Sequence, residues 1–265
     1  MKTISSKTAI VTGAGHPKGI GRAICRQLAL AGVNIAALDL TAAVGLDTVV
    51  QDLESLGVKA CSIECDVTSP MSISNALEQV RRSLGPVDLL VNNAGNNRPE
   101  HFTKVKKENM EYLVELNMKA AFNVAQLCAQ KMVQLKNRKK IGGSIINMSS
   151  QLGRVGAPIR SVYNMTKFGL EGLTRGMALE LSKSNIRVNS VCPNIVLTPR
   201  TKKYFSDKKY NKYVKESTPI NKVVTISDVA TSITFLASEA SSMITGTSII
   251  IDGGWTAKWR MFFYL

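Results

Sequence analysis

Histidine and cysteine are scarce in this sequence, and their arrangement argues against a metal site or a disulfide framework. The 265 residues include two histidines, His16 and His101, and five cysteines with no CxxC pair. Structural zinc sites need closely spaced Cys and His ligands, and an odd number of cysteines cannot all pair within one chain. We therefore expect no metal and a reducing, cytoplasmic location.

Long hydrophobic runs are also missing. Each strand-like apolar run stops after about seven residues, whereas a membrane-spanning helix needs about 20. The opening segment MKTISSKTAIVTGAG leads into glycines rather than into a signal-peptide cleavage site. We expect no membrane span and no membrane partner.

Acidic residues are few compared with basic ones. Nineteen Asp and Glu against 34 Lys and Arg give a net charge of +15, an excess that can attract polyanions. The basic residues concentrate in three blocks, and the first two contain no interleaved aromatics and no nucleic-acid motif. We interpret those two as solvated faces and expect no nucleic-acid partner. The blocks are Lys104 to Lys107, Lys136 to Lys140 and Lys202 to Lys215.

What the sequence does contain is a regular alternation of short β-branched runs and longer amphipathic stretches. The middle strands are almost continuously apolar, as is typical of a parallel sheet covered by helices on both faces. We predict one doubly wound α/β domain of the Rossmann type over residues 1–265, with a seven-stranded parallel sheet. The expected strands are 8–12, 33–38, 59–64, 88–92, 144–148, 186–191 and 248–251, and the expected helices are 20–31, 41–56, 71–84, 107–135, 162–182 and 227–236.

One connection, residues 199–224, is unusually long and rich in lysine and tyrosine. It separates the sixth predicted strand from the helix that opens at Ser227. Long irregular connections are uncommon unless they cover a site. We therefore predict that this segment is a substrate lid.

The first predicted strand runs directly into a glycine-rich loop that opens a helix. Glycines there allow a tight turn and a close approach by a pyrophosphate, whose charge the helix N-terminus stabilises. The position of the loop between a first strand and a helix predicts a dinucleotide site. The expected contacts are Gly13, Lys18, Gly19, Ile20 and Gly21.

The second predicted strand ends at Asp39, 18 residues after Gly21. A carboxylate in this place can accept hydrogen bonds from the adenosine ribose hydroxyls and repels a 2′-phosphate. Lys18 could instead pair with that phosphate, and Asp39 could be a helix N-cap. Because Asp39 ends a strand that points at the ribose, we predict NAD as cofactor, with NADP as the alternative.

From the first strand nearly to the C-terminus, the chain resembles the short-chain dehydrogenase/reductase family. The family loop TGxxxGxG is lengthened here by two residues at His16 and Pro17. The aspartate after the third strand and the sequence NNAG ending the fourth match family cofactor motifs, although NNAG alone is an ordinary turn. The resemblance implies that Asp66, Val67, Asn93, Ala94 and Gly95 contact the cofactor.

Tyr163 and Lys167 stand four residues apart and so share one face of a predicted helix. A phenol has a pKa of about 10, too high for a base at neutral pH, and a neighbouring ammonium lowers it. A YxxxK spacing alone is more typical of an ordinary amphipathic helix. The resemblance implies that Tyr163 is the general acid/base and that Lys167 also holds the nicotinamide ribose.

The resemblance implies two further catalytic residues. Ser150, 13 residues before Tyr163, matches the serine that hydrogen-bonds the substrate oxygen. Its neighbour Ser149 is the rival, and either hydroxyl could simply cap a turn. Asn117 matches the asparagine that holds a water near the lysine, although an asparagine inside a helix could merely bond to backbone.

Two C-terminal segments extend the resemblance. RVNSVCPNIVLTP matches RVNxxxPGxxxT, with Asn194 in place of a glycine, and asparagine tolerates a left-handed backbone. This match implies that Val196 and Thr198, which also lie in the segment, hold the nicotinamide carboxamide. IIIDGGW matches the family's last strand and implies a homotetramer, or a dimer. We expect the apolar tail from Trp255 to be buried or shared between subunits.

Polar and cationic residues dominate the loops expected to face the substrate, including Asn96 and Asn97. They predict a small hydroxylated or anionic substrate, such as a polyol, sugar acid or hydroxy acid. Arg98 and Arg154 could instead point to solvent or pair with surface acids. The predicted substrate contacts are Arg98, Gln151, Arg154 and Asn194.

Taken together, the motifs predict an NAD(P)-dependent oxidoreductase that transfers a hydride between a secondary alcohol, or its ketone, and the nicotinamide. A 3-oxoacyl-type or other ketone reductase using NADPH is the alternative within this class. From a different class, a cofactor-sensing or polyanion-binding protein without turnover stays possible, because fold alone does not determine chemistry.

Overall fold

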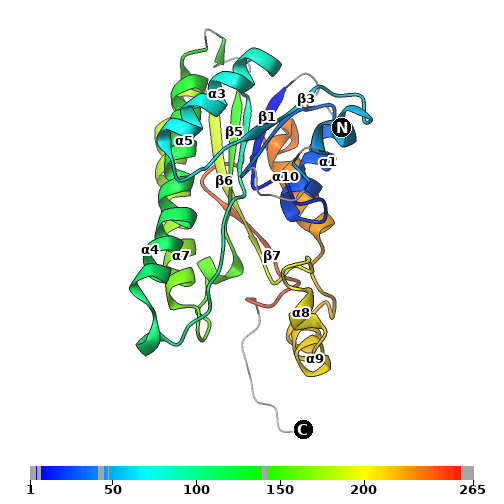
Figure 1. Cartoon of the computed structure of the whole chain (residues 1–265), viewed down its shortest axis with the longest axis vertical. Coiled ribbons are helices and arrows are strands. Elements are labelled where there is room, and N and C mark those ends of the chain that lie inside the picture. Colours follow the sequence, from blue (N-terminus) through cyan, green and yellow to red (C-terminus); the bar gives the residue numbers. More distant parts are fainter. Residues whose placement is uncertain are drawn as a thin grey trace.

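Seven parallel strands form one sheet in the order β3-β2-β1-β4-β5-β6-β7 (Figure 1). The computed structural model describes residues 4, 7–40, 45–46, 48–135, 137–138 and 142–257. The strand order reverses between β1 and β4, and such a reversal opens a crevice at the carboxyl ends of the strands. The predicted fold class is confirmed. The strands are β1 Thr8–Thr12, β2 Asn34–Asp39, β3 Ala60–Glu64, β4 Leu89–Asn92, β5 Gly143–Met148, β6 Ile186–Pro193 and β7 Ser248–Ile251.

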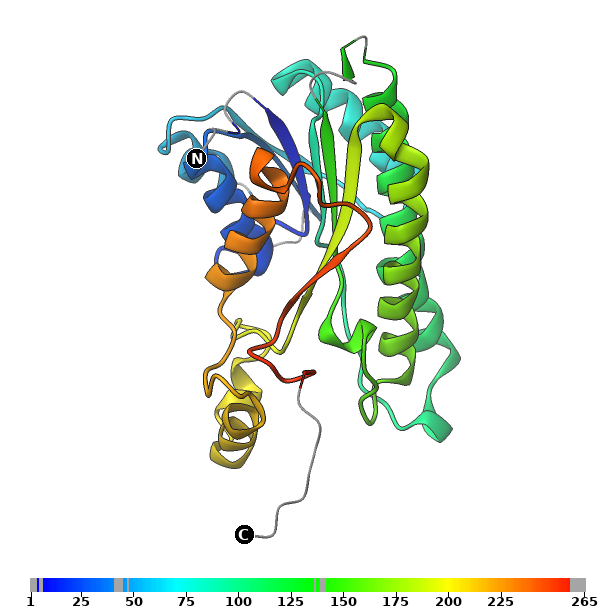
Figure 2. The same cartoon turned by 180° about the vertical axis from the view of Figure 1, so that it is seen from behind.

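Helices cover both faces of this sheet (Figures 1 and 2). Helices α1 and α10 pack together on one face, and α3, α4, α5 and α7 cover the other. The helices are α1 Ile20–Leu30, α2 Val49–Glu54, α3 Pro70–Leu84, α4 Lys107–Val114, α5 Ala120–Val133, α7 Ser161–Leu181, α8 Lys202–Phe205, α9 Lys208–Ser217 and α10 Ile226–Ala237.

The two-sided burial explains why the central strands are apolar throughout. In β1, Ala9 and Val11 belong to the core under α1 and α10, whereas Ile10 belongs to the core under α3 and α5. Successive side chains of a strand point to opposite faces, so a strand covered on both sides is mostly apolar, and its buried polar residues, such as Asn147, are hydrogen-bonded.

Two expectations about helices need correction. The helix predicted over 107–135 is interrupted by a π-helical turn at Glu115–Lys119, which inserts an extra residue between α4 and α5. The helix predicted over 41–56 is seen only as α2, and residues 41–44 and 47 lie outside the described part of the chain. The C-terminal tail from residue 258 onward also lies outside it.

The connection over 199–224 is largely helical rather than irregular. It contains α8 and α9, and a bridge between Val196 and Val224 closes its base. Asp207 caps α9 by accepting a hydrogen bond from Lys209 N at 2.8 Å. In α9, Val214 and Ser217 are buried, and together with Tyr210 and Tyr213 they recur at the spacing of one helix face.

Of the basic block at residues 136–140, the lysines lie outside the described part of the chain, and the arginine is buried. Arg138 is 2% exposed, and its Nη1 lies 3.1 Å from Asp88 Oδ1 at the start of β4. Its Nη2 donates to Val87 O at 3.0 Å. Arg138 therefore neutralises a largely buried carboxylate and ties the segment before β5 to the sheet.

Two of the expected absences concern membrane-spanning helices and metal sites. Within residues covered by the structure, no helix combines the length and apolar character needed to cross a bilayer. In the same part of the chain, no group of three or more Cys, His, Asp or Glu side chains is arranged to hold a metal ion.

Candidate active site

The loop after β1 fits tightly against the start of α1 because it contains glycine at two critical positions. Gly13 has a φ of +68°, a conformation that favours glycine. A Cβ at Gly21 would overlap Gly13 O and lie 2.9 Å from Ala14 Cα. Gly19, at the N-cap of α1, provides no side-chain cap, so the first N–H groups of this helix can face a ligand. The site therefore fits the pyrophosphate of a dinucleotide.

We expect Gly21→Ala to weaken both folding and cofactor binding, because the added methyl group has no space. The free energy of unfolding should fall by about 1–3 kcal/mol, the usual cost of overpacking. Urea denaturation and titration with NADH measure the two effects. Gly172→Ala in α7 is the matched control, since its Cβ would meet no atom within 4 Å and alanine favours a helix. Equal stability of the two variants would contradict the tight fit.

The two-residue insertion in the glycine loop forms a turn of its own. Gly19 N donates to His16 O at 2.9 Å, and Lys18 N donates to His16 Nδ1 at 3.1 Å. The side chain of Lys18 is exposed. The loop is also held from α1 by Arg22, which is 4% exposed and donates to Gly15 O at 3.1 Å. No motif of the sequence pointed to Arg22.

Asp39 lies at the end of β2, next to the glycine loop. Its Oδ2 accepts a hydrogen bond from Gly15 N, and its Oδ1 accepts one from Leu40 N, both at 2.8 Å. It is not the N-cap of α2, because that helix begins at Val49 with Thr48 in the N-cap position. The carboxylate is partly exposed, so it is placed where a ribose could reach it.

The NNAG segment joins β4 to the glycine loop. Asn93 Nδ2 donates to Thr12 O at 2.9 Å and to Gly13 O at 3.1 Å. Thr12 Oγ1 accepts from the backbone N–H groups of Asn93 and Ala94, each at 3.0 Å. The side chain of Asn93 thus shapes the loop, and its direct contact with a cofactor stays a prediction.

Asp66 follows strand β3 and is exposed. Its Oδ1 accepts hydrogen bonds from Thr68 N at 2.9 Å and from Thr68 Oγ1 at 2.7 Å, which forms a turn. The following residue, Val67, is buried. This turn lies at the carboxyl end of β3. Contact of Asp66 and Val67 with the adenine stays a prediction.

Asn117 lies in the π-helical turn and is 1% exposed. Its Nδ2 donates to Asn96 O at 2.9 Å, and its Oδ1 accepts from Asn96 N at the same distance. A Cβ at Gly95 would lie 3.1 Å from Asn117 Oδ1 and 3.8 Å from Lys167 Nζ. Asn117 therefore holds the loop after β4 beside Lys167, and both of its polar side-chain atoms are engaged in doing so.

Ser150 and Tyr163 meet between the end of β5 and the start of α7. Their hydroxyls are near enough for Ser150 to lower the pKa of Tyr163. Ser150 Oγ also accepts from Leu152 N at 3.1 Å and so begins the short turn after β5. Asn164 Nδ2 donates to Leu152 O at 2.8 Å, which fastens this turn to α7. The rival Ser149 is buried and faces Lys167 O at 3.4 Å.

Lys167 is buried one helical turn after Tyr163. Its Nζ donates to Met148 O at 2.8 Å and lies 5.5 Å from the centroid of the Tyr163 ring. Burial lowers the pKa of Lys167 to about 8, partly offset by Cys192 and Glu171. Glu171 is itself 3% exposed, and its Oε1 accepts from Cys192 Sγ at 3.4 Å.

The groups that lower the pKa of Tyr163 differ from the one expected from the sequence. Burial raises the pKa of Tyr163, and the Ser150 hydroxyl and the positive charges of Arg160 and Arg200 lower it. The sequence predicted this lowering from Lys167. In the structure, Lys167 Nζ is directed to a backbone carbonyl and lies over the ring instead of at the hydroxyl.

The two arginines predicted to face the substrate have protein partners. The guanidinium of Arg98 lies 3.7 Å from the Tyr112 ring centroid, and its Nη1 donates to Asn109 Oδ1 at 2.7 Å. Arg154 Nη1 lies 4.0 Å from Glu171 Oε2. These contacts match the alternative reading of both residues, and their role in anion binding stays a prediction.

Two other predicted substrate contacts, Gln151 and Asn194, are buried. Gln151 Oε1 has no hydrogen-bond partner within the described chain. Asn194 does not have a positive φ, so the left-handed turn that asparagine was expected to tolerate at this position is not formed. Its N–H donates to Ile251 O at 2.9 Å and its Oδ1 accepts from Ile195 N at 2.7 Å, so it connects β6 to β7.

The segment predicted to hold a carboxamide follows directly. Val196 is buried at the base of the 199–224 connection. Thr198 is half-buried, and its N–H donates to Thr201 Oγ1 at 2.9 Å. Both residues lie at the carboxyl end of β6, and their contact with a cofactor stays a prediction.

The fold and the geometry of the site together define a class of enzyme. A glycine loop shaped for a pyrophosphate lies at the same edge of the sheet as a tyrosine, a serine and a lysine that can exchange a proton with an alcohol oxygen. That combination is an oxidoreductase that uses a nicotinamide dinucleotide and acts on secondary alcohols or ketones.

Comparison with known proteins identifies the family. A family model described as Enoyl-(Acyl carrier protein) reductase matches residues 13–256. D-beta-hydroxybutyrate dehydrogenase of Rhizobium meliloti (strain 1021) is 34% identical, covering 96% of this chain and 100% of that protein. L-xylulose reductase of Bos taurus is 37% identical, with 96% and 98% covered. The chain belongs to the short-chain dehydrogenase/reductase family and is an NAD(P)-dependent oxidoreductase.

A solved structure shows the same similarity. The gluconate 5-dehydrogenase from Burkholderia cenocepacia J2315, in complex with NADP and tartrate, has a TM-score of 0.89 and 27% identity to this chain. The match covers 97% of this chain and 98% of that one.

Proposed function

We propose that Tyr163 is the general acid/base of a reversible alcohol dehydrogenation, with Ser150, Lys167 and Asn117 as its partners. The observation that carries the proposal is the position of Lys167, which is buried one helical turn after Tyr163 with its Nζ 5.5 Å from the tyrosine ring centroid, while the Ser150 hydroxyl lowers the pKa of Tyr163. When bound, the nicotinamide accepts the hydride from the carbinol carbon or returns it. Tyr163 takes the alcohol proton during oxidation and gives it back during reduction.

The partners have separate tasks. Ser150 Oγ donates a hydrogen bond to the substrate oxygen and keeps it next to Tyr163 Oη. Lys167 holds the nicotinamide ribose and passes the proton onward, and its pKa of about 8 allows it to both hold and release a proton near neutral pH. Asn117 positions the loop at Gly95 and Asn96 beside Lys167.

The experiment that tests this proposal is an assay of cofactor reduction with a panel of secondary alcohols, and of cofactor oxidation with the matching ketones. NAD and NADP are run in parallel. We expect turnover with at least one small hydroxylated or anionic alcohol. Tight cofactor binding without turnover of any member of the panel would favour a cofactor-sensing protein instead.

We propose that NAD is the preferred cofactor, because Asp39 places a carboxylate beside the glycine loop at the end of β2. Asp39→Ser should raise kcat/KM for NADP relative to NAD by about 10-fold or more, since it removes the charge that repels a 2′-phosphate. Glu64→Ser is the control, because Glu64 is the exposed register partner of Asp39 on β3. A wild-type preference for NADP would mean that Lys18 outweighs Asp39.

We propose that residues 199–224 form a lid over the site and that the whole chain acts as one unit. Figure 1 shows α8 and α9 beyond the carboxyl ends of the strands. Arg200 Nη1 donates to Asn96 Oδ1 at 3.0 Å, which ties the start of this segment to the loop after β4.

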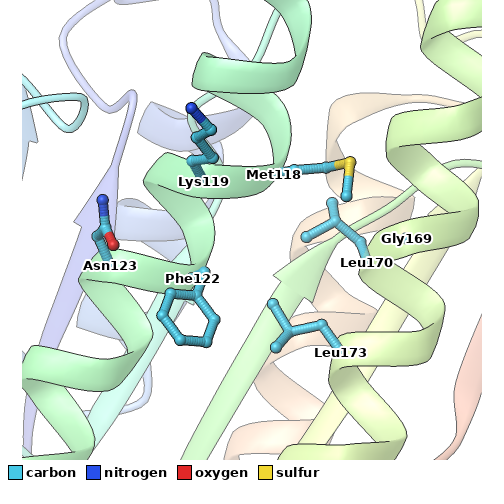
Figure 3. A pocket seen from close by; sticks show the side chains of 7 residues that line it. All are labelled: Met118, Lys119, Phe122, Asn123, Gly169, Leu170 and Leu173. Atoms are coloured by element: carbon cyan, nitrogen blue, oxygen red, sulfur yellow. The ribbon is translucent and has the colours of Figure 1, made fainter.

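We propose a homotetramer, or a dimer, formed through the outer faces of α5 and α7. Phe122, Met165 and Phe168 are each more than 40% exposed on these helices. A hollow of about 320 Å³ lies between the same helices, away from Tyr163, and Figure 3 shows Met118, Phe122 and Leu173 lining it. Sedimentation of the purified chain measures the oligomer, and a monomer would contradict this proposal.

We propose a cytoplasmic location, supported by the state of the cysteines. All five are free thiols in the structure. Burial raises the pKa of Cys25 and of Cys128 to about 12, which keeps both thiols protonated and unreactive. Fractionation of cells that express the natural chain tests the location.

A further inference from the structure

Arg22 lies in the first turn of α1, directly after the glycine loop, and is 4% exposed. Arginine is rarely buried to this extent unless its charge is paired. Its Nη2 donates to Gly15 O at 3.1 Å and to Gly45 O in the connection after β2. Its Nη1 lies 3.4 Å from Asp52 Oδ2 in α2. One side chain of α1 thus joins the glycine loop to the two segments that follow β2.

Gly15 is held at both of its backbone polar groups. Its N–H donates to Asp39 Oδ2 at 2.8 Å, and its carbonyl oxygen accepts from Arg22. The N–H of Ala14 donates to Leu38 O at 3.2 Å, so the loop is also attached to the end of β2. Gly15 is therefore the link between the buried guanidinium and the carboxylate of Asp39.

The insertion in the glycine loop begins directly after Gly15, at His16 and Pro17. Two added residues give the loop more conformational freedom, which other contacts must restrict. A Cβ at Gly45 would lie 2.7 Å from Pro17 Cγ and 3.1 Å from Gly15 O, so the connection after β2 packs closely on the lengthened loop. The bonds from Arg22 to Gly15 O and Gly45 O fasten the two segments together at this contact.

The guanidinium of Arg22 is not available to a cofactor phosphate. Its Nη1 faces Asp52, and its Nη2 donates to two backbone carbonyls. Its Nε is buried and has no hydrogen-bond partner among the residues that the structure describes. Arg22 can therefore affect a dinucleotide only through the groups that it holds. Lysine could not replace it, because a single ammonium lacks the planar fork that reaches several acceptors at once.

We infer that Arg22 is a positioning residue for cofactor choice. Through Gly15 it holds the Asp39 carboxylate in the orientation that accepts the adenosine ribose of NAD and repels the 2′-phosphate of NADP. The inference rests on the proposed NAD preference. Each carboxylate oxygen of Asp39 already accepts one backbone N–H, from Gly15 or from Leu40, and keeps capacity for a second donor. Without Arg22 the lengthened loop no longer presents Gly15 N–H at a fixed place, and the carboxylate can turn away.

Fluorescence titration of the whole chain with NADH and with NADPH tests the inference without need of turnover. Arg22→Met should weaken NADH binding by about 10-fold or more and NADPH binding by less than about threefold, because only NADH depends on the carboxylate. The ratio of the two affinities should fall accordingly. Arg22→Lys should lose a similar part of the ratio, since it keeps the charge but not the fork.

A double-mutant cycle shows whether Arg22 acts through Asp39. Asp39→Ser alone removes the carboxylate, so adding Arg22→Met to it should change the affinity ratio by less than about twofold. Arg26→Met is the matched control, because Arg26 lies on the same helix and pairs with the same Asp52 but is 48% exposed. This control should retain the wild-type ratio.

Equal weakening of NADH and NADPH by Arg22→Met, or the same change of the ratio with and without Asp39, would overturn the inference and leave Arg22 a purely structural residue. Full selectivity in Arg22→Lys would also overturn it. Circular dichroism checks the fold of each variant. If Arg22→Met does not fold, Arg22→Lys takes its place in the cycle, because it keeps a positive charge beside Asp52. A wild type that favours NADPH would reject the proposed NAD preference, whereas a coupled cycle would still support the role of Arg22.

Discussion

Replacing Tyr163 by phenylalanine should lower kcat by about 10³-fold, within the range that general acid/base catalysis contributes. The variant lacks the hydroxyl that exchanges a proton with the substrate oxygen and whose pKa Ser150 lowers. The aromatic ring that packs near Lys167 is retained. The fold and the affinity for NADH should therefore remain close to those of the wild type.

Steady-state kinetics, circular dichroism and a fluorescence titration with NADH measure the three properties. Tyr213→Phe is the matched control, because this ring in α9 is 48% exposed and packs edge-on against Trp255 at 5.7 Å, away from Ser150. It should change kcat less than about twofold, as expected for a residue of the proposed lid whose hydroxyl takes no part in the proton transfer. A Tyr163→Phe enzyme that keeps a tenth of the wild-type rate would exclude this phenol as the proton carrier.

Replacing Lys167 by methionine should abolish activity and at the same time stabilise the chain at pH 7. Burial lowers the pKa of Lys167 from 10.5 to about 8. Below pH 8 both the folded and the unfolded chain carry the proton, so the folded chain bears the full cost of a buried ammonium. Methionine removes that cost, and the free energy of unfolding should rise by about 1–3 kcal/mol after the loss of the bond to Met148 O is included.

The gain in stability from Lys167→Met should depend on pH. Between pH 8 and 10.5 the folded wild type releases its proton before the unfolded chain does, so Lys167 makes wild-type stability rise with pH over this window. The advantage of Lys167→Met should thus shrink from pH 7 to pH 10. Urea denaturation at both values measures it, with Lys119→Met as control because Lys119 is exposed and paired with Glu115. If Lys167→Met were less stable than the wild type by the same amount at pH 7 and at pH 10, the result would contradict a buried charge on Lys167.

The strands could be predicted closely from the sequence. Residues 8–12 and 248–251 agree with β1 and β7 to the residue. Strands buried on both faces must be apolar throughout and end where polar or glycine-rich turns begin, so their limits are visible in the residues themselves. α9 was not predicted, although Asp207 caps it and its Tyr210, Tyr213 and Val214 follow a helical spacing. Only the contact of Tyr213 with Trp255 depends on a segment distant in sequence.

In the candidate site, too, some features could be predicted from the sequence and others could not. The spacing of Tyr163 and Lys167 placed both on α7, because four residues make one helical turn in any protein. The direction of the lysine amine, toward Met148 O, could not be predicted, since its partner comes from β5. Likewise, the bonds of Asn194 to neighbouring strands replaced the local conformation that its residue type suggested.

By itself, the sequence determined which segments are strands, where the glycine loop and the NNAG turn lie, and that Tyr163 and Lys167 share one helix face. Each of these features depends on residues a few positions apart. Only the tertiary structure decided which charges are neutralised. Arg138 and Arg154 found acidic partners within the chain, whereas Arg98, Arg160 and Arg200 remained without an ion pair among the described residues. Charges interact across space and not along the sequence, so the partner of each arginine depends on segments that meet only when the chain folds.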